Sequence, residues 1–378
     1  MKSYGRQTIS AEDERAIIEC LRSDFLTQGP KVKELESNVA AFCGADYAVA
    51  VNSATSALHI ACLALGLKSG DTVWTSANTF VASANCARMC GADVDFVDID
   101  PDTGNMCVEA LAHKLADAKA SSTLPKVIIP VHFSGQSCDM KRIAELVAPF
   151  GIKIIEDASH ALGGQYQGKP VGYCEYSDIS VFSFHPVKMI TTAEGGMALT
   201  QNKQLADTMR LYSSHGIRKV ENDPSMPPWY YEQHLLGFNY RMSDLNAALG
   251  VSQLKNLSAW VTKRNELARY YDACFAGTDV QPLVQKVDGV SSYHLYVIKV
   301  DPSKRLTVFI KLRELGVGVQ VHYIPVYQQP YYQALGFKPL PNTQSYYSQC
   351  ISLPLYPTLS IEEQDSVVHL VRQALEQS

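Results

Sequence analysis

The sequence predicts an α/β fold: a largely parallel sheet covered by helices on both faces, followed by a smaller α+β part. After Gly44, short apolar runs alternate with helical stretches, which is typical of such a sheet. The chain has 378 residues, enough for two or three domains. The pattern of strand and helix candidates changes after about residue 275, and this change predicts a second domain.

The elements of the first part follow in order. A capping-box pattern from Ser10 to Asp13 opens a helix that ends near Leu21, and a second helix covers residues 31–42. A helix at 56–65 ends at Gly66, because glycine readily adopts the left-handed conformation after a last turn. Seven segments read as strands: residues 47–51, 72–75, 94–99, 127–132, 152–156, 179–184 and 197–200.

One long helix is expected at residues 243–275, bridging a large domain (1–250) and a small one (251–378). Its apolar stripe recurs at helical spacing. The small domain has strand candidates at 292–300 and 317–322, a helix at 306–315, and a last helix from Ser360.

Composition excludes several classes of protein. The net charge is −5, with 33 basic and 38 acidic residues, whereas nucleic-acid binders usually carry a basic excess. No apolar run approaches the roughly 20 residues that span a bilayer, and the N-terminus resembles no secretory signal. The ten cysteines form no CxxC pair and the histidines show no metal-ligand spacing. We therefore expect a cytoplasmic protein with reduced cysteines, no metal site, and neither nucleic acid nor membrane as partner.

The first segment with chemical potential is residues 52–59, where a strand ends in small hydroxyl residues and a helix begins at once. Free N–H groups at a helix N-terminus bind anions, so a phosphate could lie on Ala54, Thr55 and Ser56. Ordinary N-capping by serine or threonine is the competing interpretation.

The second segment is residues 154–160, in which an apolar strand delivers Asp157 to the edge of the sheet. Such a carboxylate could hold a proton on a cofactor nitrogen or bind a metal. The competing interpretation is a helix cap, with His160 as a structural histidine.

The third segment is residues 180–196, where a strand runs into a turn that presents Lys188. A lysine over a cleft can form a Schiff base when burial lowers its pKa. A lone loop lysine is usually only solvated. However, a phosphate-binding turn, a strand-end aspartate and a strand-end lysine together are the groups that a pyridoxal phosphate site needs.

These segments resemble the DegT/DnrJ/EryC1/StrS family of sugar aminotransferases, which are fold-type I pyridoxal-phosphate enzymes. The resemblance covers essentially the whole chain, from residues 26–30 to residues 353–357. Its motifs are Glu-Asp-Ala-Ser-His at 156–160, Ser-Phe-His-Pro-Val-Lys at 183–188, Thr-Ala-Glu-Gly-Gly at 192–196 and Gly-Phe-Asn-Tyr-Arg-Met-Ser-Asp at 237–244. The motif at 183–188, with Ser-Tyr-His-Leu-Tyr at 292–296, most resembles the C4 aminotransferases of pseudaminic acid biosynthesis.

The resemblance implies a role for each matching residue. Lys188 would bind the cofactor covalently, and Asp157 would pair with its ring nitrogen. Phe80 would stack on the ring and His160 would lie beside Asp157. Thr55, Ser56 and Ser183 would bind the phosphate. In a homodimer with shared sites, Asn239 would reach the neighbour's phosphate and Arg241 the amino donor's carboxylate; an ordinary polar loop is the alternative for both. His322 and Tyr323 are candidates for substrate contact, with core packing as the alternative.

The implied reaction is transamination. L-glutamate would give its amino group to a UDP-linked 4-keto-6-deoxy-2-acetamido sugar, leaving 2-oxoglutarate and, on the enzyme, pyridoxamine phosphate between the two halves. Alternatives are another nucleotide sugar (GDP- or dTDP-linked, at C3 or C4), a sugar dehydratase, in which His replaces the lysine, and a non-catalytic relative. The chain departs from many members at Ala193, where glycine is common, and we expect an ordinary φ there.

Overall fold

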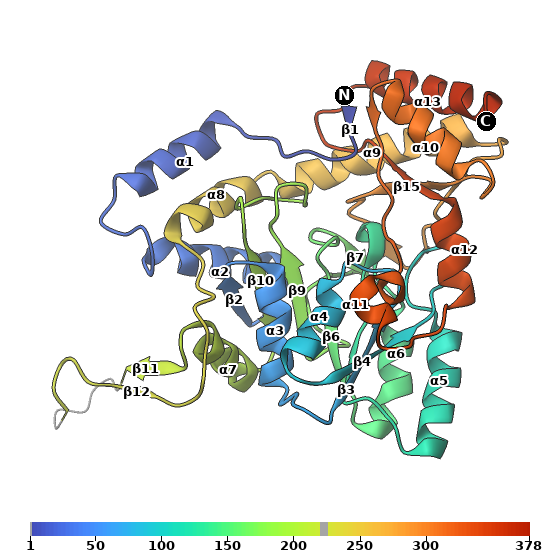
Figure 1. Ribbon diagram of the computed structural model, residues 1–378. Coiled ribbons are helices and arrows are strands. Elements are labelled where there is room, and N and C mark those ends of the chain that lie inside the picture. Colours follow the sequence, from blue (N-terminus) through green and yellow to red (C-terminus); the bar gives the residue numbers. More distant parts are fainter. Residues whose placement is uncertain (1, 220–225) are drawn as a thin grey trace.

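The computed structural model describes residues 2–219 and 226–378, and a seven-stranded sheet forms its centre (Figure 1). The strand order is β2-β10-β9-β6-β5-β3-β4, and within this sheet only β10 runs antiparallel to its neighbours. The predicted mostly parallel sheet is confirmed. Its strands are β2 (Tyr47–Val51), β3 (Thr72–Ser76), β4 (Asp93–Val97), β5 (Val127–Ile129), β6 (Lys153–Asp157), β9 (Ile179–Ser183) and β10 (Gly196–Thr200).

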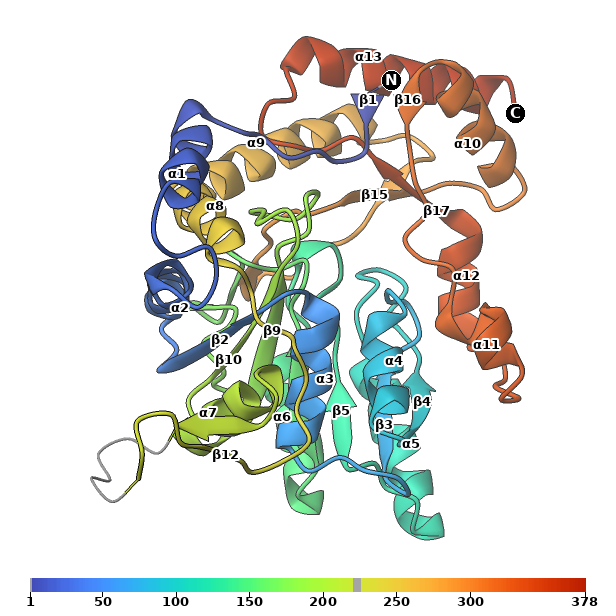
Figure 2. The same cartoon turned by 60° about the vertical axis from the view of Figure 1, so that its left-hand side comes forward.

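Helices cover both faces of this sheet (Figure 2). In β5, Val127 and Ile129 pack in a core with α3, α4 and α7, whereas Ile128 packs in another with α5 and α6. This alternation follows from the pleat, which turns successive side chains to opposite faces. Near β2 and β10, α2 covers the same face of the sheet as α5 and α6. The helices are α2 (Pro30–Cys43), α3 (Ala54–Ala64), α4 (Ala82–Met89), α5 (Val108–Ser121), α6 (Met140–Val147) and α7 (Lys203–Ser213).

The C-terminal part surrounds the antiparallel sheet β13-β15-β17. Its hydrophobic core draws only on residues from Leu267 onwards. The first residues also join it, because β1 (Lys2–Ser3) pairs with β16 (Val317–Gly318). The division at residue 250 stays a prediction. The main elements are α9 (Leu257–Phe275), β13 (Gln281–Pro282), β15 (Tyr296–Lys299), α10 (Arg305–Glu314), α11 (Pro330–Gln333), α12 (Pro341–Gln349), β17 (Cys350–Leu353) and α13 (Ile361–Glu376).

The prediction of one helix over residues 243–275 is wrong. Two helices cover this stretch, α8 (Asp244–Leu254) and α9. The N–H groups of Lys255 and Asn256 bond three residues back, to Ser252 and Gln253. This tight last turn ends α8, and a new helix begins after Asn256, a residue with low helix propensity.

Some predicted strands are shorter than expected. Only Val317–Gly318 of the 317–322 candidate and Tyr296–Lys299 of the 292–300 candidate form strands. Before β15, the backbone of Ser292 bonds the carbonyl of Gly135 instead of a strand partner. The N-terminal helix α1 (Ala11–Leu21) begins with the predicted capping box of Ser10 and Asp13.

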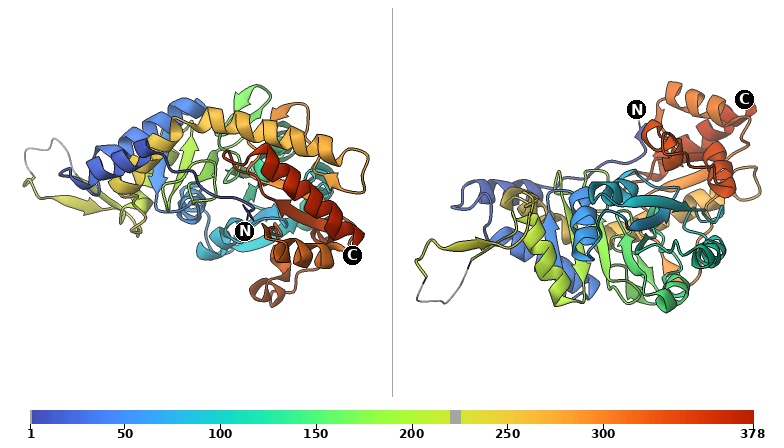
Figure 3. Two further views of the ribbon diagram at one scale, coloured as in Figure 1. Left: turned by 90° about the horizontal axis from the view of Figure 1, so that it is seen from above. Right: turned by 60° about the horizontal axis from the view of Figure 1, so that its bottom comes forward.

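A hairpin arm formed by β11 (Ile217–Lys219) and β12 (Tyr231–Gln233) projects from the body (Figure 3). Among the described residues, no helix combines the length and apolar character needed to cross a bilayer. Short strands complete the fold: β7 (Gln165–Tyr166), β8 (Lys169–Pro170) and β14 (Gly289–Val290).

Candidate active site

A cleft of about 370 Å³ lies at the carboxyl ends of the central strands. Ligands of open α/β sheets bind at this edge, because several strands deliver side chains to one place. The structure brings most of the predicted site residues together in this cleft: Ala54, Thr55, Phe80, Asp157, His160, Ser183, Lys188, His322 and Tyr323.

The N-terminus of α3 forms one end of the cleft. The hydroxyl of Ser53 caps the helix by accepting the N–H of Ser56 at 3.1 Å. The N–H groups of Ala54 and Thr55, in the first helical turn, have no partner among the described residues. Both residues line the cleft with Ser183, and two free N–H donors and a hydroxyl are groups that could bind an anion there; we call this the anion position.

Gly196 lets the backbone approach this helix closely. A Cβ at this position would lie 2.4 Å from the backbone nitrogen of Ala54. The register explains the approach, because Gly196 pairs with Val51 on one side and with Ser183 on the other. Gly196 therefore lies between Ser183 and the N-terminus of α3, and its lack of a side chain lets the two approach each other.

Ser56 differs from its predicted role. Its hydroxyl donates to Asn52 Oδ1 at 2.6 Å and its N–H is used by Ser53, so neither donor is free. Ser56 does not line the cleft, whereas Ser53 does. Sequence reasoning missed Ser53, although its place directly before the helix is the usual N-cap signal.

Asp157 ends β6 with its carboxylate buried. Oδ2 accepts a hydrogen bond from the hydroxyl of Ser83 at 2.5 Å, and Oδ1 accepts the N–H of Ser159 at 3.1 Å. Glu156, the preceding residue, bonds His132 at 2.6 Å and does not line the cleft. The carboxylate is thus held by two donors and lines the cleft. Ser83 carried no motif that sequence reasoning could have recognised.

Lys188 follows β9 in a turn closed by its N–H bond to the carbonyl of His185 at 2.9 Å. Its Nζ has no hydrogen-bond or ion-pair partner among the residues that the structure describes. Burial lowers the pKa of Lys188 to about 8, although the negative charge of Asp157 opposes the shift. About a tenth of the amine is therefore neutral at pH 7, and this neutral form is nucleophilic and basic.

His160 and Tyr323 form a pair in the cleft. Tyr323 Oη lies 3.0 Å from His160 Nε2, and the two rings stack at 6.1 Å. Burial and the charge of Lys188 hold the pKa of His160 well below its usual value. His322 hydrogen-bonds Ser352 through Nδ1 at 2.8 Å, and the same causes lower its pKa to about 3. Both imidazoles are therefore neutral.

Phe80 presents an open aromatic ring to the cleft, with 59% of its surface exposed.

On the loop after Lys188, the expectation of an ordinary φ at Ala193 is wrong, because its φ is +63°. The N–H of Ala193 bonds Thr191 Oγ1 at 2.9 Å, and the carbonyl of Thr192 accepts the side-chain amide of Asn246. These bonds hold alanine in a conformation that favours glycine.

Asn239 and Arg241 do not line the cleft of their own chain. Phe238 and Tyr240 stack on each other at 4.9 Å, and Tyr240 Oη contacts His59 on α3 at 3.1 Å. Arg241 donates to Ser214 Oγ at 3.3 Å and Asn239 is exposed. The alternation places 238 and 240 against the body, and 239 on the outside.

The residues of the cleft fit pyridoxal phosphate. The α3 terminus offers free donors for a phosphate, Asp157 offers a fixed carboxylate for a ring nitrogen, and Lys188 offers an unpaired amine. Phe80 supplies a free face for a planar ring. No group of three or more His, Cys, Asp or Glu residues suited to a metal occurs in the described parts of the chain.

Comparison with known proteins decides the family. The model of the DegT/DnrJ/EryC1/StrS aminotransferase family matches residues 7–372. The chain belongs to this family. It is therefore a pyridoxal-phosphate-dependent aminotransferase, and the predicted cofactor is confirmed.

Two relatives in sequence span nearly the whole chain. The spore coat polysaccharide biosynthesis protein SpsC of Bacillus subtilis is 40% identical, with 98% of this chain and 96% of that protein covered. The UDP-4-amino-4,6-dideoxy-N-acetyl-beta-L-altrosamine transaminase of Campylobacter jejuni is 39% identical, with 96% and 94% covered.

Solved structures agree. PseC of Helicobacter pylori, an aminotransferase involved in the biosynthesis of pseudoaminic acid, has a TM-score of 0.93 at 34% identity, with 100% of this chain and 99% of that chain covered. Spr1654 of Streptococcus pneumoniae, solved in its PLP form, has a TM-score of 0.89 at 30% identity, with 99% of this chain and 98% of that chain covered. The predicted fold-type I architecture is confirmed.

Proposed function

We propose that this aminotransferase moves the amino group of L-glutamate to C4 of a nucleotide-linked 4-keto-6-deoxy sugar. The substrate we favour is a UDP-linked 2-acetamido-2,6-dideoxy-hexos-4-ulose, and the products are the 4-amino sugar and 2-oxoglutarate. The activities for which the Campylobacter and Helicobacter relatives are named support this choice. The product would enter pseudaminic acid or a related surface glycan, and we keep the prediction of a cytoplasmic enzyme.

The observation that carries the proposal is the unpaired Lys188 amine in one cleft with the fixed carboxylate of Asp157. When bound, pyridoxal phosphate supplies an electron sink for the carbon next to the reacting nitrogen. Asp157 would keep a proton on the ring nitrogen, which deepens that sink. Lys188 Nζ, with its lowered pKa, would remove the α-proton of the amino donor as a base and return a proton as an acid.

The other reactions fit less well. A sugar dehydratase of this family would carry histidine in place of Lys188, and this chain has lysine. A non-catalytic relative has no need for a buried, unpaired amine beside a carboxylate. Another nucleotide or another position on the sugar remains the second candidate for the substrate.

We also propose a homodimer with shared sites. Asn239 and Arg241 lie outside their own cleft, as expected if they serve the neighbour. The arm between α7 and α8 exposes large apolar side chains, with Trp229 at 79% and Leu236 at 81%. Such a surface suits a second copy of the chain, since an isologous interface gives both copies the same contacts.

The substrate is tested by mass spectrometry of products. The enzyme is incubated with glutamate and a panel of UDP-, GDP- and dTDP-linked 4-keto and 3-keto sugars. We expect the UDP-linked 4-keto-2-acetamido sugar to be aminated with the highest kcat/KM. Preference for a GDP or dTDP sugar would overturn the substrate, and loss of water without amination would overturn transamination.

A further inference from the structure

We propose that a crevice beside the turn of Lys188 binds one chloride ion, held by the guanidinium of Arg264 and the hydroxyl of Thr8. The crevice is a different cavity from the cofactor cleft, although Lys188 lines both. The site depends on neither the cofactor nor the sugar of the proposed function. Two unpaired buried groups, the charges along the crevice and its size support it.

Arg264 lies on α9 with only 2% of its surface exposed. Its Nη1 donates to the backbone carbonyls of Tyr293, His294 and Leu355, at 3.1, 3.4 and 2.9 Å. The buried Nε–H has no partner among the described residues, and Nη2 makes no hydrogen bond to any of them. Nε and Nη2 carry adjacent N–H groups on one edge of the planar guanidinium, and such an edge can hold an anion through two bonds.

No acidic group balances the charge of this guanidinium. Burial alone lowers the pKa of Arg264 to about 10, so the group is still charged at neutral pH. Arg6 and Lys188 also line the crevice, and none of the described residues that line it is acidic. A buried charge without a counter-ion is unfavourable, and a bound anion would remove this imbalance.

Thr8 supplies a second unpaired group to the same crevice. Its backbone carbonyl accepts the side-chain amide of Gln253 at 2.9 Å, which holds this part of the N-terminal segment against α8. Its hydroxyl oxygen is buried and has no partner in the described parts of the chain. Buried hydroxyls are normally hydrogen-bonded, so this one indicates an occupant that accepts its proton. A water molecule could accept that proton too, but it would leave the charge of Arg264 unbalanced.

The size of the crevice limits the occupant. Its volume of about 10 Å³ gives room for one water-sized particle, so a monatomic ion suits it better than a phosphate or a sugar. The crevice joins the N-terminal segment at Thr8, α9 at Arg264 and the lysine turn at Pro186 and Met189. A bound ion would therefore connect these three segments. Because a ligand stabilises the state that binds it, chloride should stabilise the folded enzyme.

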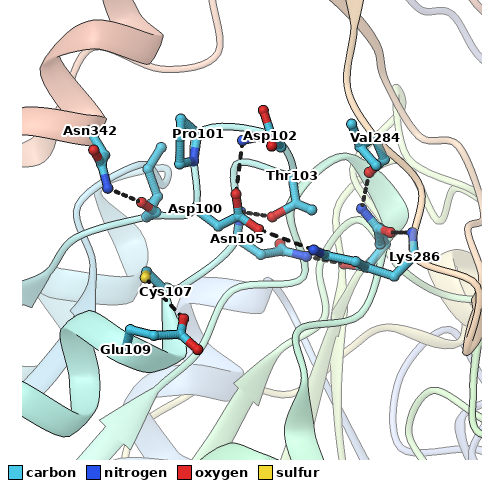
Figure 4. Close-up of polar contacts among 12 residues, drawn as sticks. Asp100, Pro101, Asp102, Thr103, Asn105, Cys107, Glu109, Val284, Lys286 and Asn342 are labelled. Atoms are coloured by element: carbon cyan, nitrogen blue, oxygen red, sulfur yellow. Dashed lines mark hydrogen bonds and ion pairs between the residues drawn. The ribbon is translucent and has the colours of Figure 1, made fainter.

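The polar cluster around Lys286 provides a contrast, because its charge is balanced (Figure 4). Lys286 Nζ pairs with Asp100 Oδ2 at 3.4 Å, and the N–H of Lys286 bonds Gln136 Oε1 at 2.5 Å. In the same cluster, Asn105 Nδ2 donates to the carbonyl of Gln136 at 3.1 Å. These groups have partners within the protein, whereas the free edge of Arg264 has none among the described residues.

Anomalous scattering locates the ion directly. Crystals of the holoenzyme are soaked in sodium bromide, because bromide replaces chloride and scatters anomalously. The bound cofactor keeps the anion position at α3 filled. We expect a bromide peak in contact with Nε and Nη2 of Arg264 and with Oγ1 of Thr8. A crevice that holds water and no bromide would overturn the proposal.

A chloride titration tests the same site in solution. Thermal unfolding of the holoenzyme is followed while sodium chloride replaces sodium gluconate at constant ionic strength, since gluconate is too large for the crevice. Tm should rise and then saturate. Thr8→Val keeps the shape of the side chain but removes one bond to the ion. It should raise the chloride concentration at half-effect about tenfold, as expected for losing a hydrogen bond to a charged group.

Thr262→Val is the matched control, because Thr262 is exposed on α9 outside the crevice and should leave the half-effect concentration unchanged. Arg264→Met removes the charge and should abolish both the bromide peak and the chloride response. If that variant fails to fold, Thr8→Val carries the test alone. A Tm that is insensitive to chloride, or the same half-effect concentration in the parent and in Thr8→Val, would overturn the proposal.

Discussion

Ser83 donates its hydroxyl proton to Asp157 Oδ2 over 2.5 Å, so that helix α4 holds the carboxylate at the end of β6. Ser83 has a single proton, so the Thr79 hydroxyl, 2.7 Å away, must donate to Ser83 Oγ. The two hydroxyls and Asp157 are buried and form one directed chain. The orientation of Asp157 therefore depends on Ser83 and on Thr79, which lies next to Phe80 on the loop before α4.

Replacing Ser83 should weaken catalysis without unfolding the protein. Ser83→Ala frees one carboxylate oxygen to turn, so we expect kcat to fall about tenfold, the cost of one charge-assisted bond. Steady-state kinetics at saturating glutamate measure the effect. Ser76→Ala is the control, because its buried hydroxyl has no hydrogen-bond partner within residues 2–219 and 226–378, so its loss should leave kcat unchanged. Equal rates for both variants would show that Ser83 does not position Asp157.

Gly196→Ala should damage the anion position. The new Cβ would lie 2.4 Å from the backbone nitrogen of Ala54, and backbone must shift to admit it. Overpacking of this kind costs about 1–3 kcal/mol. We expect a lower Tm and weaker cofactor binding, measured by thermal unfolding and by titration with pyridoxal phosphate. Gly5→Ala, where the nearest atom is Val187 Cβ at 3.8 Å, should change neither quantity.

The amine of Lys188 should titrate near pH 8 in the cofactor-free protein. Burial lowers its pKa, so the amine is charged below pH 8 and neutral above it. Competitive acetylation followed by mass spectrometry should show the reactivity of Lys188 rising through that pH, with exposed Lys33 as internal reference. Because the charge of Asp157 raises the pKa of Lys188, Asp157→Asn should move the midpoint lower. A midpoint that moves higher would refute this account of the site.

Shared sites are tested by complementation. Lys188→Ala and the double variant Asn239→Ala/Arg241→Ala should each be nearly inactive alone. In a mixed dimer one site receives both defects and the other receives none, so activity should return to at most about half per heterodimer. Subunit exchange must be verified by native mass spectrometry. Recovery of no activity after verified exchange would mean that the two residues serve their own chain.

Much of the site could be predicted because strand ends and helix starts leave strong local patterns. Asp157 ends β6 and Lys188 follows β9, and parallel strands bring such ends to one edge. Ser83 could not be predicted, because its importance comes from packing α4 against β6, which are distant in sequence. The phosphate-binding role predicted for Ser56 shows the opposite problem. Its local pattern suited a phosphate, but its N–H already bonds Ser53 and its hydroxyl already bonds Asn52.

The helices, strands and turns could likewise be predicted only where a local sequence pattern marks them. The seven strands of the sheet were recognisable because helices cover both of its faces, so most positions of each strand are buried and the strands carry short apolar runs. The break at Lys255–Asn256 was not, since the apolar stripe continues through it at helical spacing. The left-handed Ala193 was also hidden, because the bonds that hold it involve Asn246, over 50 positions away.

Transfer of labelled nitrogen tests the central claim most directly. The enzyme is incubated with ¹⁵N-glutamate and the UDP-linked 4-keto-6-deoxy-2-acetamido sugar, and the products are weighed by mass spectrometry. The account predicts a 4-amino sugar that carries ¹⁵N, formed with one equivalent of 2-oxoglutarate, and no such product with Lys188→Ala. An unlabelled amino sugar, or a labelled product made equally well by Lys188→Ala, would contradict it.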